Sequence, residues 1–284
     1  MMNTAAIYIL YNPDLTLLNK SLSVCLDLVD HIYIIDNSDE DMTEYFASIK
    51  YRKVSYIALS KNMGIAYALN IGCQIAKDEG YIWALTMDQD SIPPFNMITD
   101  YINYLKQENN SKIALVGCVS KAYIGENIRS ERKVYVDAVN IYTSGSFMNL
   151  IIWAAVGGFN EELFIDCVDY EYCLRLLQNC FEVHQLGYVV LEHKLGDTHK
   201  YRFCGRGFYV TNHNYVRRYY ITRNLLWVRN KYKDAFSDIE VEGKVSSMCK
   251  IVFKILFFER DKWRKIRSIY RGYMDFQKNK MGVY

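Results

Sequence analysis

The sequence predicts an α/β fold, with a mostly parallel sheet flanked by helices and a helical, basic extension at its C-terminal end. Two features point to this class. In the first hundred residues, short β-prone apolar runs alternate with stretches whose apolar residues recur at helical spacing. Beyond about residue 200 the pattern becomes helical and rich in Lys and Arg. The chain has 284 residues, of which 51% are hydrophobic, so it can bury a sizeable core.

The first hundred residues contain four expected strands and two expected helices. Pro13 disfavours a helix at the residue before it and can open one after it. Strands joined by helices require right-handed crossovers, and ligands then bind at the carboxyl ends of the strands. The strands are expected at 4–11, 31–36, 54–59 and 81–88, and the helices at 15–26 and 65–80.

The remainder of the chain is less regular. It has no internal repeat, low-complexity tract or Pro/Gly-rich linker, and its 3 prolines argue against a flexible hinge. A single domain over 1–232 with an extension over 233–284 is the simplest division. Strands are expected at 113–119, 134–142 and 182–191, a tight connection at 144–146, and helices at 168–179, 214–232, 244–258 and 261–278.

The composition excludes several classes of protein. No apolar run reaches the roughly 18 residues that an ordinary transmembrane helix needs. The N-terminal residues lack the basic region and cleavage pattern of a secretory signal. The 8 cysteines form no CxxC pair, so we expect small hydrophobic side chains in a reducing cytosol. These features predict a cytoplasmic protein.

The net charge of +2 conceals an asymmetry along the chain. Through residue 199 there are 14 basic and 25 acidic side chains, whereas residues 200–284 carry 20 basic and 7 acidic ones. A basic tail suggests an anionic partner, such as a diphosphate ligand, phospholipid headgroups or nucleic acid. Residues 244–284 combine this charge with Phe, Trp and Ile. That combination suits either a membrane surface or a helix packed on the main domain with its cationic side in water.

A pair of carboxylates, Asp88 and Asp90, directly follows the fourth expected strand. Two acids at i and i+2 beyond a strand end can converge on one hard cation. Mg²⁺ or Mn²⁺ accepts such oxygen ligands and leaves sites for phosphate oxygens. A polar turn at a strand end would have the same short pattern. The lone His193 after strand 182–191 is either structural or a ligand, and His199 and His213 compete for that role.

A second group of carboxylates crowds the start of the expected helix 168–179. The helix dipole favours negative charge there, and Glu171 and Arg175 have the spacing of a surface ion pair. Alternatively, one of these acids is a general base, since Asp or Glu can take a proton from an attacking hydroxyl. The group consists of Glu161, Glu162, Asp166, Asp169 and Glu171.

Together these motifs resemble the family 2 glycosyltransferases and, within them, the bacterial rhamnosyltransferase-like branch. They follow the family's order over roughly residues 4–230. The matching stretches are YNP (11–13), IDNS (35–38), NMGIA (62–66), DQDS (88–91), GGFNEELFIDCVDYEYCLR (157–175) and HNYVRRYYITRN (213–224).

The resemblance implies a GT-A fold, a nucleotide-sugar donor and inversion at the anomeric carbon. Residues 1–92 would form the nucleotide-sugar-binding part and residues 93–232 the acceptor and catalytic part. The donor would be dTDP- or UDP-linked, with dTDP-rhamnose as the expected case. The acceptor would be a saccharide, carried on a polyprenyl diphosphate, in the synthesis of a cell-surface polysaccharide such as O-antigen or capsule. Such an acceptor would bring the enzyme to the inner face of the plasma membrane as a peripheral protein.

The family's nucleotide pocket carries over position by position. Asp36 matches the carboxylate that recognises the pyrimidine base, and Tyr11 and Asn12 would line the same pocket. Asn62 and Gly64 match the loop that packs near the nucleotide.

Around the diphosphate, the resemblance places Asp88 near the donor ribose and makes Asp90 the main ligand of Mg²⁺ or Mn²⁺. His193 resembles the distal histidine that completes this metal site in many GT-A enzymes. A further matching segment would lie near the diphosphate and the acceptor, without individual roles: Arg217, Tyr220, Arg223 and Asn224.

The expected catalytic base is Asp169, which matches the second acid of the family's Glu-Asp motif. Here the pair is Val168-Asp169, a departure from the general family that suits the rhamnosyltransferase-like form. It leaves Asp166 and Glu171 as alternative bases, acceptor contacts or supporting residues. The base would take the acceptor's proton as the new bond forms, with no covalent enzyme intermediate.

Other classes of function fit the sequence less well. A sugar-phosphate nucleotidyltransferase normally has a Gly-rich, basic phosphate loop after the first strand, where this chain has Tyr-Asn-Pro-Asp. A dehydrogenase would need GxGxxG there. A catalytically silent binding or scaffold subunit of a polysaccharide assembly would need neither the DQD motif nor the Asp169 block. Nucleic-acid binding has only the basic tail in its favour.

Overall fold

The computed structural model describes residues 3–48, 52–120, 133–139, 141–193, 199–203, 206–236 and 245–284. The chain forms two compact units. The first consists of Met1–Glu161 and Asp169–Lys194, and the second of Glu162–Val168 and Leu195–Tyr284. The helix expected at 214–232 belongs to the second unit, where it packs against the last helix of the chain.

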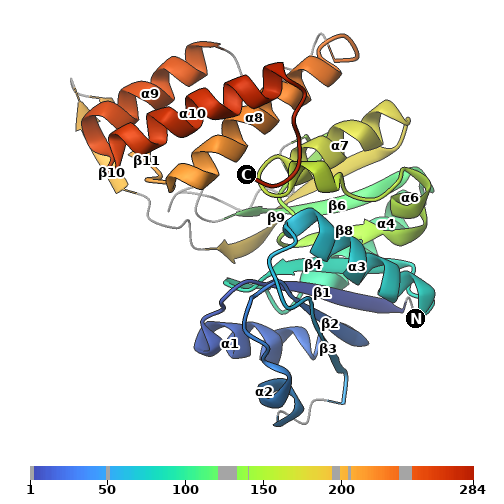
Figure 1. The fold of residues 1–284 in the computed structure, drawn as a ribbon. Coiled ribbons are helices and arrows are strands. Elements are labelled where there is room, and N and C mark those ends of the chain that lie inside the picture. Colours follow the sequence, from blue (N-terminus) through green and yellow to red (C-terminus); the bar gives the residue numbers. More distant parts are fainter. Residues whose placement is uncertain are drawn as a thin grey trace. The chain divides into compact units, whose positions relative to one another are not determined.

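The first unit is built on a sheet with strand order β3-β2-β1-β4-β8-β6-β9-β5, and β7 pairs with β9 (Figure 1). Strands β1 to β4 run parallel, as do β6 and β9. The short strands β5, β7 and β8 are antiparallel to their neighbours. The strands are β1 (Thr4–Leu10), β2 (His31–Asp36), β3 (Val54–Ala58), β4 (Trp83–Asp88), β5 (Ser91–Ile92), β6 (Ile113–Ser120), β7 (Val134–Val136), β8 (Ser146–Asn149) and β9 (Glu182–His193).

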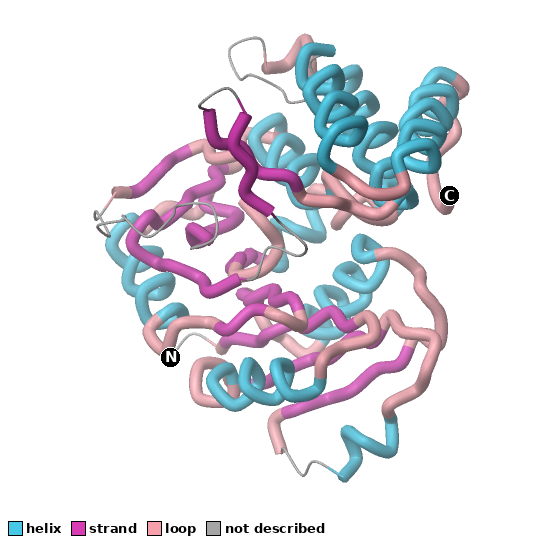
Figure 2. Tube along the Cα trace, turned by 90° about the vertical axis from the view of Figure 1, so that its left-hand side faces the viewer, coloured by secondary structure: helices cyan, strands magenta, loops and turns pink. Residues whose placement is uncertain are grey.

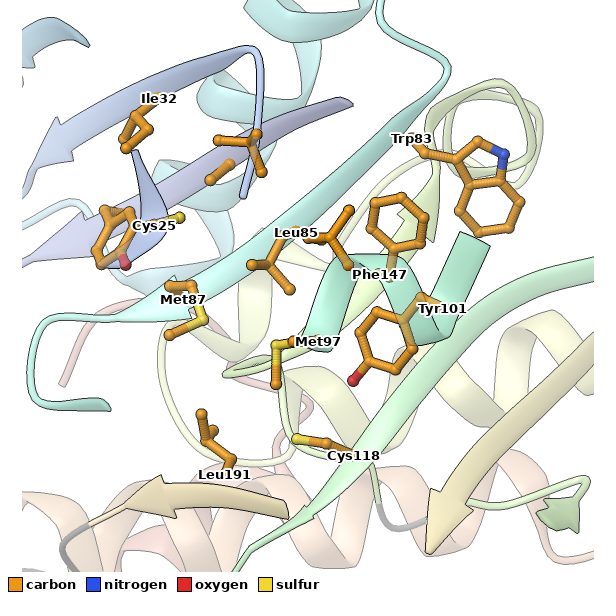
Figure 3. Close-up of a cluster of buried hydrophobic side chains, with 14 of the residues drawn as sticks. Cys25, Ile32, Trp83, Leu85, Met87, Met97, Tyr101, Cys118, Phe147 and Leu191 are labelled. Atoms are coloured by element: carbon orange, nitrogen blue, oxygen red, sulfur yellow. The ribbon is translucent and has the colours of Figure 1, made fainter. Parts of the chain in front are cut away.

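Helices cover both faces of this sheet, as predicted. Successive residues of a strand point to opposite faces. Tyr8 and Leu10 of β1 pack in the cluster formed with α1, α2 and α4, part of which Figure 3 shows around Met87 and Met97. Ile7 faces α3, where a Cβ on Gly72 would lie 2.4 Å from its side chain, so only glycine allows this close approach. The helices are α1 (Leu15–Cys25), α2 (Thr43–Ser48), α3 (Ile65–Asp78), α4 (Met97–Glu108), α6 (Leu150–Ala155) and α7 (Val168–Gln178), with a 3-10 turn at Glu161–Leu163.

The four N-terminal strands agree with the sequence expectation, but the middle of the chain differs from it. The strand expected at 134–142 is only Val134–Val136. The connection expected at 144–146 leads directly into β8, which was not predicted. The Asn149 side chain ends this strand and caps α6, accepting hydrogen bonds from the N–H groups of Ile151 and Ile152.

The second unit contains three helices and a hairpin: α8 (Tyr215–Tyr232), α9 (Val245–Phe258), α10 (Lys262–Gln277), β10 (His199–Phe203) and β11 (Arg206–Val210). The hairpin, drawn in magenta in Figure 2, differs from the helical pattern expected beyond residue 200. Helices α8 and α10 lie side by side. A Cβ on Gly272 would be 2.7 Å from the carbonyl oxygen of Tyr219, so the missing side chain lets these two helices approach closely.

A buried charged network joins the helices of the second unit. Glu259 accepts hydrogen bonds from Arg218 at 2.5 Å and from Lys265 at 2.9 Å. Burial lowers the pKa of His213 to about 3, and the nearby cations Arg217, Arg218 and Lys265 act in the same direction. His213 is therefore neutral at physiological pH.

No described helix is both long and apolar enough to cross a bilayer.

Candidate active site

The carboxyl ends of β1, β2 and β4 meet at one edge of the sheet. In the parallel register, Asp36 of β2 lies beside Leu10 of β1, and Asp88 of β4 lies beside Ile9 of β1. Tyr11 follows β1 directly. Parallel α/β sheets bind ligands at this edge. The structure thus brings together Tyr11, Asn12, Asp36, Asp88 and Asp90, although they are up to 79 positions apart in the sequence.

Asp36 lies at the centre of a hydrogen-bond network. The residue is only 1% exposed. Its carboxylate accepts hydrogen bonds from the N–H of Ser38 at 2.9 Å and from the hydroxyl of Tyr56 at 2.8 Å. Burial raises the pKa of Tyr56 well above its usual range, which keeps this donor protonated. The Ser38 hydroxyl in turn accepts the N–H of Asn12 at 2.7 Å. A carboxylate has about four acceptor positions, so Asp36 has capacity for a further donor.

Gln89, between the two aspartates of the DQD motif, joins the loop after β4 to the loop after β1. Its Oε1 accepts the N–H of Tyr11 at 2.7 Å, and its Nε2 donates to the carbonyl of Tyr11 at 3.1 Å. The backbone of Tyr11 is therefore held on both sides, while the residue is 46% exposed. We did not predict this role for Gln89, since its only signal in the sequence is its place between two carboxylates.

The loop before α3 is shaped by two asparagines. The Oδ1 of Asn62 accepts the N–H of Gly64 at 3.0 Å and the side-chain amide of Asn37 at 3.1 Å. The Oδ1 of Asn37 accepts the N–H of Met63 at 2.7 Å. Gly64, with φ of 90°, begins α3 in a conformation that other residues rarely adopt. Asn37 directly follows Asp36, the last residue of β2, so this loop lies at the same edge of the sheet as the carboxylate.

Asp88, the last residue of β4, and Asp90 are the residues expected to hold a divalent cation. Both are half-buried, and the backbone N–H of Asp88 donates to the Ser144 hydroxyl at 3.2 Å. Backbone pairing of Ser91 with His193 brings the end of β9 beside the residue that follows Asp90. The imidazole of His193 lies outside the described side chains, so its expected role as a ligand is not tested. Among the described residues, no group of three or more His, Cys, Asp or Glu is arranged to hold a metal ion. One or two carboxylates, completed by substrate phosphates and water, is the usual arrangement for Mg²⁺.

Asp169 lines a small pocket in the first unit. It is the second residue of α7, and its carboxylate accepts the N–H of Tyr170 at 2.9 Å. The cavity has a volume of about 10 Å³, close to the minimum for one water molecule. Its lining comes from β6, β8, α7 and the segments around them: Leu115, Ile141, Thr143, Ser146, Met148, Phe159, Asp169, Tyr172 and Cys173.

One turn connects this cavity with the metal-binding aspartates expected after β4. Thr143 lines the cavity beside Asp169, and its carbonyl accepts the hydroxyl of Thr86 in β4. The next residue, Ser144, accepts the N–H of Asp88. The expected base and the expected donor-binding carboxylate therefore both lie beside residues 143–144.

Glu171 is an internal residue. It is fully buried and accepts a hydrogen bond from Arg175 at 2.9 Å, and Arg175 also donates to the carbonyl of Val156 at 2.9 Å. The interpretation of Glu171 and Arg175 as a surface pair is therefore wrong. The geometry fits the supporting role among those considered for Glu171, because its carboxylate holds Arg175, whose guanidinium bonds the carbonyl of Val156 at the end of α6.

In the second unit, Asp166 pairs with Arg217. The guanidinium Nε lies 3.0 and 3.3 Å from the two carboxylate oxygens. Burial raises the pKa of Asp166, and the charge of Arg217 opposes this rise. The Arg217 side chain is half exposed, so its outer donors can reach a ligand.

Tyr220, Arg223 and Asn224, which we expected near the donor, are buried inside the second unit. The polar groups of Arg223 and Asn224 bond to backbone carbonyls of the segment 162–166. The Tyr220 ring stacks on the Phe164 ring, with the two ring centroids 5.1 Å apart. These contacts do not agree with direct donor binding by these three residues. They indicate that the residues support the segment that leads into α7.

Comparison with known proteins identifies the family. Residues 7–149 match the model of glycosyl transferase family 2. The chain belongs to glycosyltransferase family 2. In this family 2 glycosyltransferase, the matched region runs from β1 to the end of β8. It therefore contains the whole edge formed by Tyr11, Asp36, Asp88 and Asp90, whereas Asp169 lies beyond it.

A curated relative of this glycosyltransferase is the dTDP-rhamnosyl transferase RfbF of Shigella flexneri. It is 31% identical over 245 residues, which cover 81% of this chain and 80% of that protein. This similarity supports the rhamnosyltransferase-like branch that the motifs indicated.

Two solved structures show the same fold. The S. aureus TarS 1-349 complex with UDP-GlcNAc has a TM-score of 0.61 and 10% identity, and the match covers 97% of this chain and 80% of that chain. The structure of GalNAc-T7 with UDP, GalNAc and Mn²⁺ has a TM-score of 0.62 and 12% identity, and the match covers 89% of this chain and 54% of that one. This glycosyltransferase thus spans about half the length of the GalNAc-T7 chain, and the predicted GT-A fold is confirmed.

Proposed function

We propose that this glycosyltransferase moves rhamnose from dTDP-rhamnose to a saccharide acceptor, with inversion at the anomeric carbon. The observation that carries the proposal is the convergence of Asp36, Asp88 and Asp90 on one edge of the sheet. Residues 143–144 connect this edge with Asp169, because Ser144 bonds Asp88 and Thr143 lines the pocket beside Asp169. The choice of donor rests on the 31% identical relative, which is named a dTDP-rhamnosyl transferase. UDP sugars are the alternative donors, because the structurally similar TarS was solved in complex with UDP-GlcNAc.

In this proposal, the nucleotide edge orients the donor. Asp36 accepts the ring N–H of the pyrimidine with the acceptor capacity that Ser38 and Tyr56 leave unused. Tyr11, whose backbone Gln89 holds, presents its ring to the base. Because these contacts involve groups shared by thymine and uracil, they select a pyrimidine and leave the choice between the two nucleotides to other contacts.

Asp88 and Asp90 would hold Mg²⁺ or Mn²⁺, with His193 as the expected third ligand. A cation bound there would neutralise the charge that develops on the leaving nucleoside diphosphate. Asp169 takes the proton of the acceptor hydroxyl as that oxygen attacks the anomeric carbon. The sugar–phosphate bond breaks in the same displacement, and the nucleoside diphosphate leaves with the bonding electrons. Inversion follows because attack and departure occur on opposite faces of the sugar.

The test of this function is a panel of nucleotides with the purified protein. Thermal unfolding is measured with dTDP, UDP, GDP and ADP, each with Mn²⁺ and each with EDTA. A ligand that binds only the folded state raises the melting temperature according to its concentration and affinity. We expect dTDP to give the largest shift, UDP a smaller one, and both shifts to fall sharply with EDTA. A purine-selective or metal-independent shift would contradict the proposal.

The acceptor is proposed to be a saccharide on a polyprenyl diphosphate, which places the reaction at a membrane surface. The corner between α9 and α10 supports this location. Trp263 is 81% exposed and Phe257 65% exposed. Between them lie the exposed cations Arg260 and Lys262. Aromatic rings next to cations suit the interface of an anionic bilayer, where the rings enter the headgroup layer and the cations pair with phosphates.

Liposome flotation tests the membrane contact. The double variant Phe257→Ala/Trp263→Ala is compared with Phe95→Ala, a matched control because Phe95 is 83% exposed on the first unit. With vesicles that contain anionic lipid, we expect wild-type protein and the control to float and the double variant to lose most of its binding. Flotation should also weaken at high salt. Equal flotation of the double variant and the control would show that this corner is not the membrane contact.

A further inference from the structure

We infer that Arg223 and Asn224 are positioning residues for the catalytic segment, acting as one clamp on the backbone of residues 162–166. The inference deepens the proposed function and rests on it, since this segment carries Asp166 and runs directly into the helix that carries Asp169. The sequence alone associated both residues with ligand binding. Their contacts in the structure point instead to control of a loop conformation.

Asn224 bonds three carbonyl groups of one short segment. Its Nδ2 lies 2.9 Å from the carbonyl oxygen of Leu163, 2.8 Å from that of Ile165 and 2.9 Å from that of Asp166. An amide nitrogen has two hydrogens, so at least one of them is shared between two carbonyl oxygens. The side chain is fully buried. The orientation of three peptide carbonyl groups thus depends on a single side-chain amide.

Arg223 sets the orientation of that amide. Its Nε donates to the Oδ1 of Asn224 at 2.9 Å, which directs the NH₂ group of Asn224 toward the carbonyls. Its NH2 group donates to the carbonyls of Glu162 at 3.1 Å and Leu163 at 3.3 Å. Its NH1 group donates to the carbonyl of Gly282 at 2.6 Å. The N–H of Gly282 donates a hydrogen bond to the carbonyl of Glu162 at 2.9 Å, so the C-terminal residues complete the clamp.

The clamped segment needs such support because its backbone is strained. Phe164, Asp166 and Cys167 all have positive φ values, of 65°, 64° and 64°. Non-glycine residues rarely adopt this conformation, and it persists only where the surroundings enforce it. Stacking of Phe164 on Tyr220 adds a side-chain contact to the backbone ones. Strain of this kind occurs at functional sites, and here it includes Asp166 and ends two residues before Asp169, the two carboxylates considered for the proton transfer.

The clamp is also more polar than a purely structural contact requires. Arg223 is fully buried, and a buried guanidinium is costly unless its donors are satisfied. Apolar side chains of similar volume would fill this space at lower cost, but they could not dictate the direction of four peptide groups. The arginine and asparagine therefore specify one conformation of the segment.

The test compares Asn224→Ala and Arg223→Lys with Asn230→Ala, a matched control because Asn230 is exposed on the same helix. Three quantities are measured: kcat and KM for the donor, the nucleotide-induced shift in melting temperature, and the rate of chymotryptic cleavage after Phe164, followed by mass spectrometry. We expect Asn224→Ala to lower kcat by about 10²-fold, because a misplacement of about 1 Å has that effect. Donor KM and the nucleotide shift should stay within about twofold of wild type, since donor binding does not depend on the clamp in this account.

Cleavage after Phe164 should accelerate at least about tenfold in Asn224→Ala, because a loosened segment exposes its backbone to protease more often. Arg223→Lys keeps the positive charge but loses the several N–H donors of the planar guanidinium group. This variant should show the same changes to a smaller degree. If Asn224→Ala does not fold, Arg223→Lys decides the question. Wild-type kcat and wild-type cleavage in a folded variant would overturn the inference. So would a fall in nucleotide binding that parallels the fall in kcat. The cleavage rate tests the clamp even if wild-type protein transfers no sugar, so failure of the proposed function can be recognised separately.

Discussion

Asp169→Asn is expected to abolish most turnover while leaving the donor bound. General-base catalysis contributes about 10²- to 10⁴-fold, so kcat should fall within that range. Asparagine has nearly the same shape and can still accept the Tyr170 N–H, so the start of α7 should remain intact. The nucleotide-induced shift in melting temperature should be unchanged, because Asp36 and Asp90 lie on other elements. Single-turnover rates with donor and acceptor give the most direct measure.

Two further variants identify the base among the nearby acids. Asp166→Asn removes the partner of Arg217, and we expect a smaller fall in kcat from it than from Asp169→Asn. Asp27→Asn is the matched control, since Asp27 is exposed and follows α1 at the opposite end of the strands. Normal turnover in Asp169→Asn, together with collapse in Asp166→Asn, would transfer the role of base to Asp166.

Asp90→Asn is expected to remove the metal-dependent part of nucleotide binding. A bound cation that stabilises the leaving diphosphate is worth several kcal/mol, so kcat should fall by about 10³-fold. The stabilisation of the protein by dTDP with Mn²⁺ should fall to the level that wild-type protein shows with EDTA. Asp88→Asn should have a smaller effect, because the resemblance places this residue nearer the ribose than the metal. Isothermal titration of each variant with dTDP, at fixed Mn²⁺, measures the affinities.

A full Mn²⁺-dependent affinity in Asp90→Asn would exclude Asp90 as the main ligand. Asn12→Ala serves as a comparison within the same pocket. It should weaken dTDP binding equally with and without Mn²⁺, because Asn12 has a positive φ of 47°, which alanine tolerates less well, so the base side of the pocket is disturbed.

The N-terminal half of the fold could be predicted because its strands are buried and are separated by clear helical spacing. The expected strand at 31–36 is found as His31–Asp36. Strands β2 and β4 both pair in parallel with β1, so Asp36 and Asp88, which the resemblance assigned to one nucleotide site, lie at the same edge of the sheet. Strand β8 escaped prediction because four residues are too few to show alternation, and its partners β4 and β6 are far away in the sequence.

The motifs nominated candidate site residues but gave no sign of the contacts that hold them. Gln89 has no signal as a backbone clamp for Tyr11, because that contact joins residues 78 positions apart. Asn224 and the carbonyl of Asp166 are 58 positions apart. Motif resemblance could associate Asn224 with the site, but only the folded backbone distinguishes a residue that binds a ligand from one that holds a loop.

In the proposed function, Asp88 and Asp90 at the end of β4 bind the donor diphosphate through a divalent cation. A crystal grown with MnCl₂ and dTDP, with diffraction data collected at the manganese absorption edge, tests it directly. The account predicts an anomalous peak within bonding distance of an Asp90 oxygen and of a diphosphate oxygen, with the thymine above Asp36. An ordered dTDP without such a peak, and with the Asp90 carboxylate directed away from the phosphates, would contradict it.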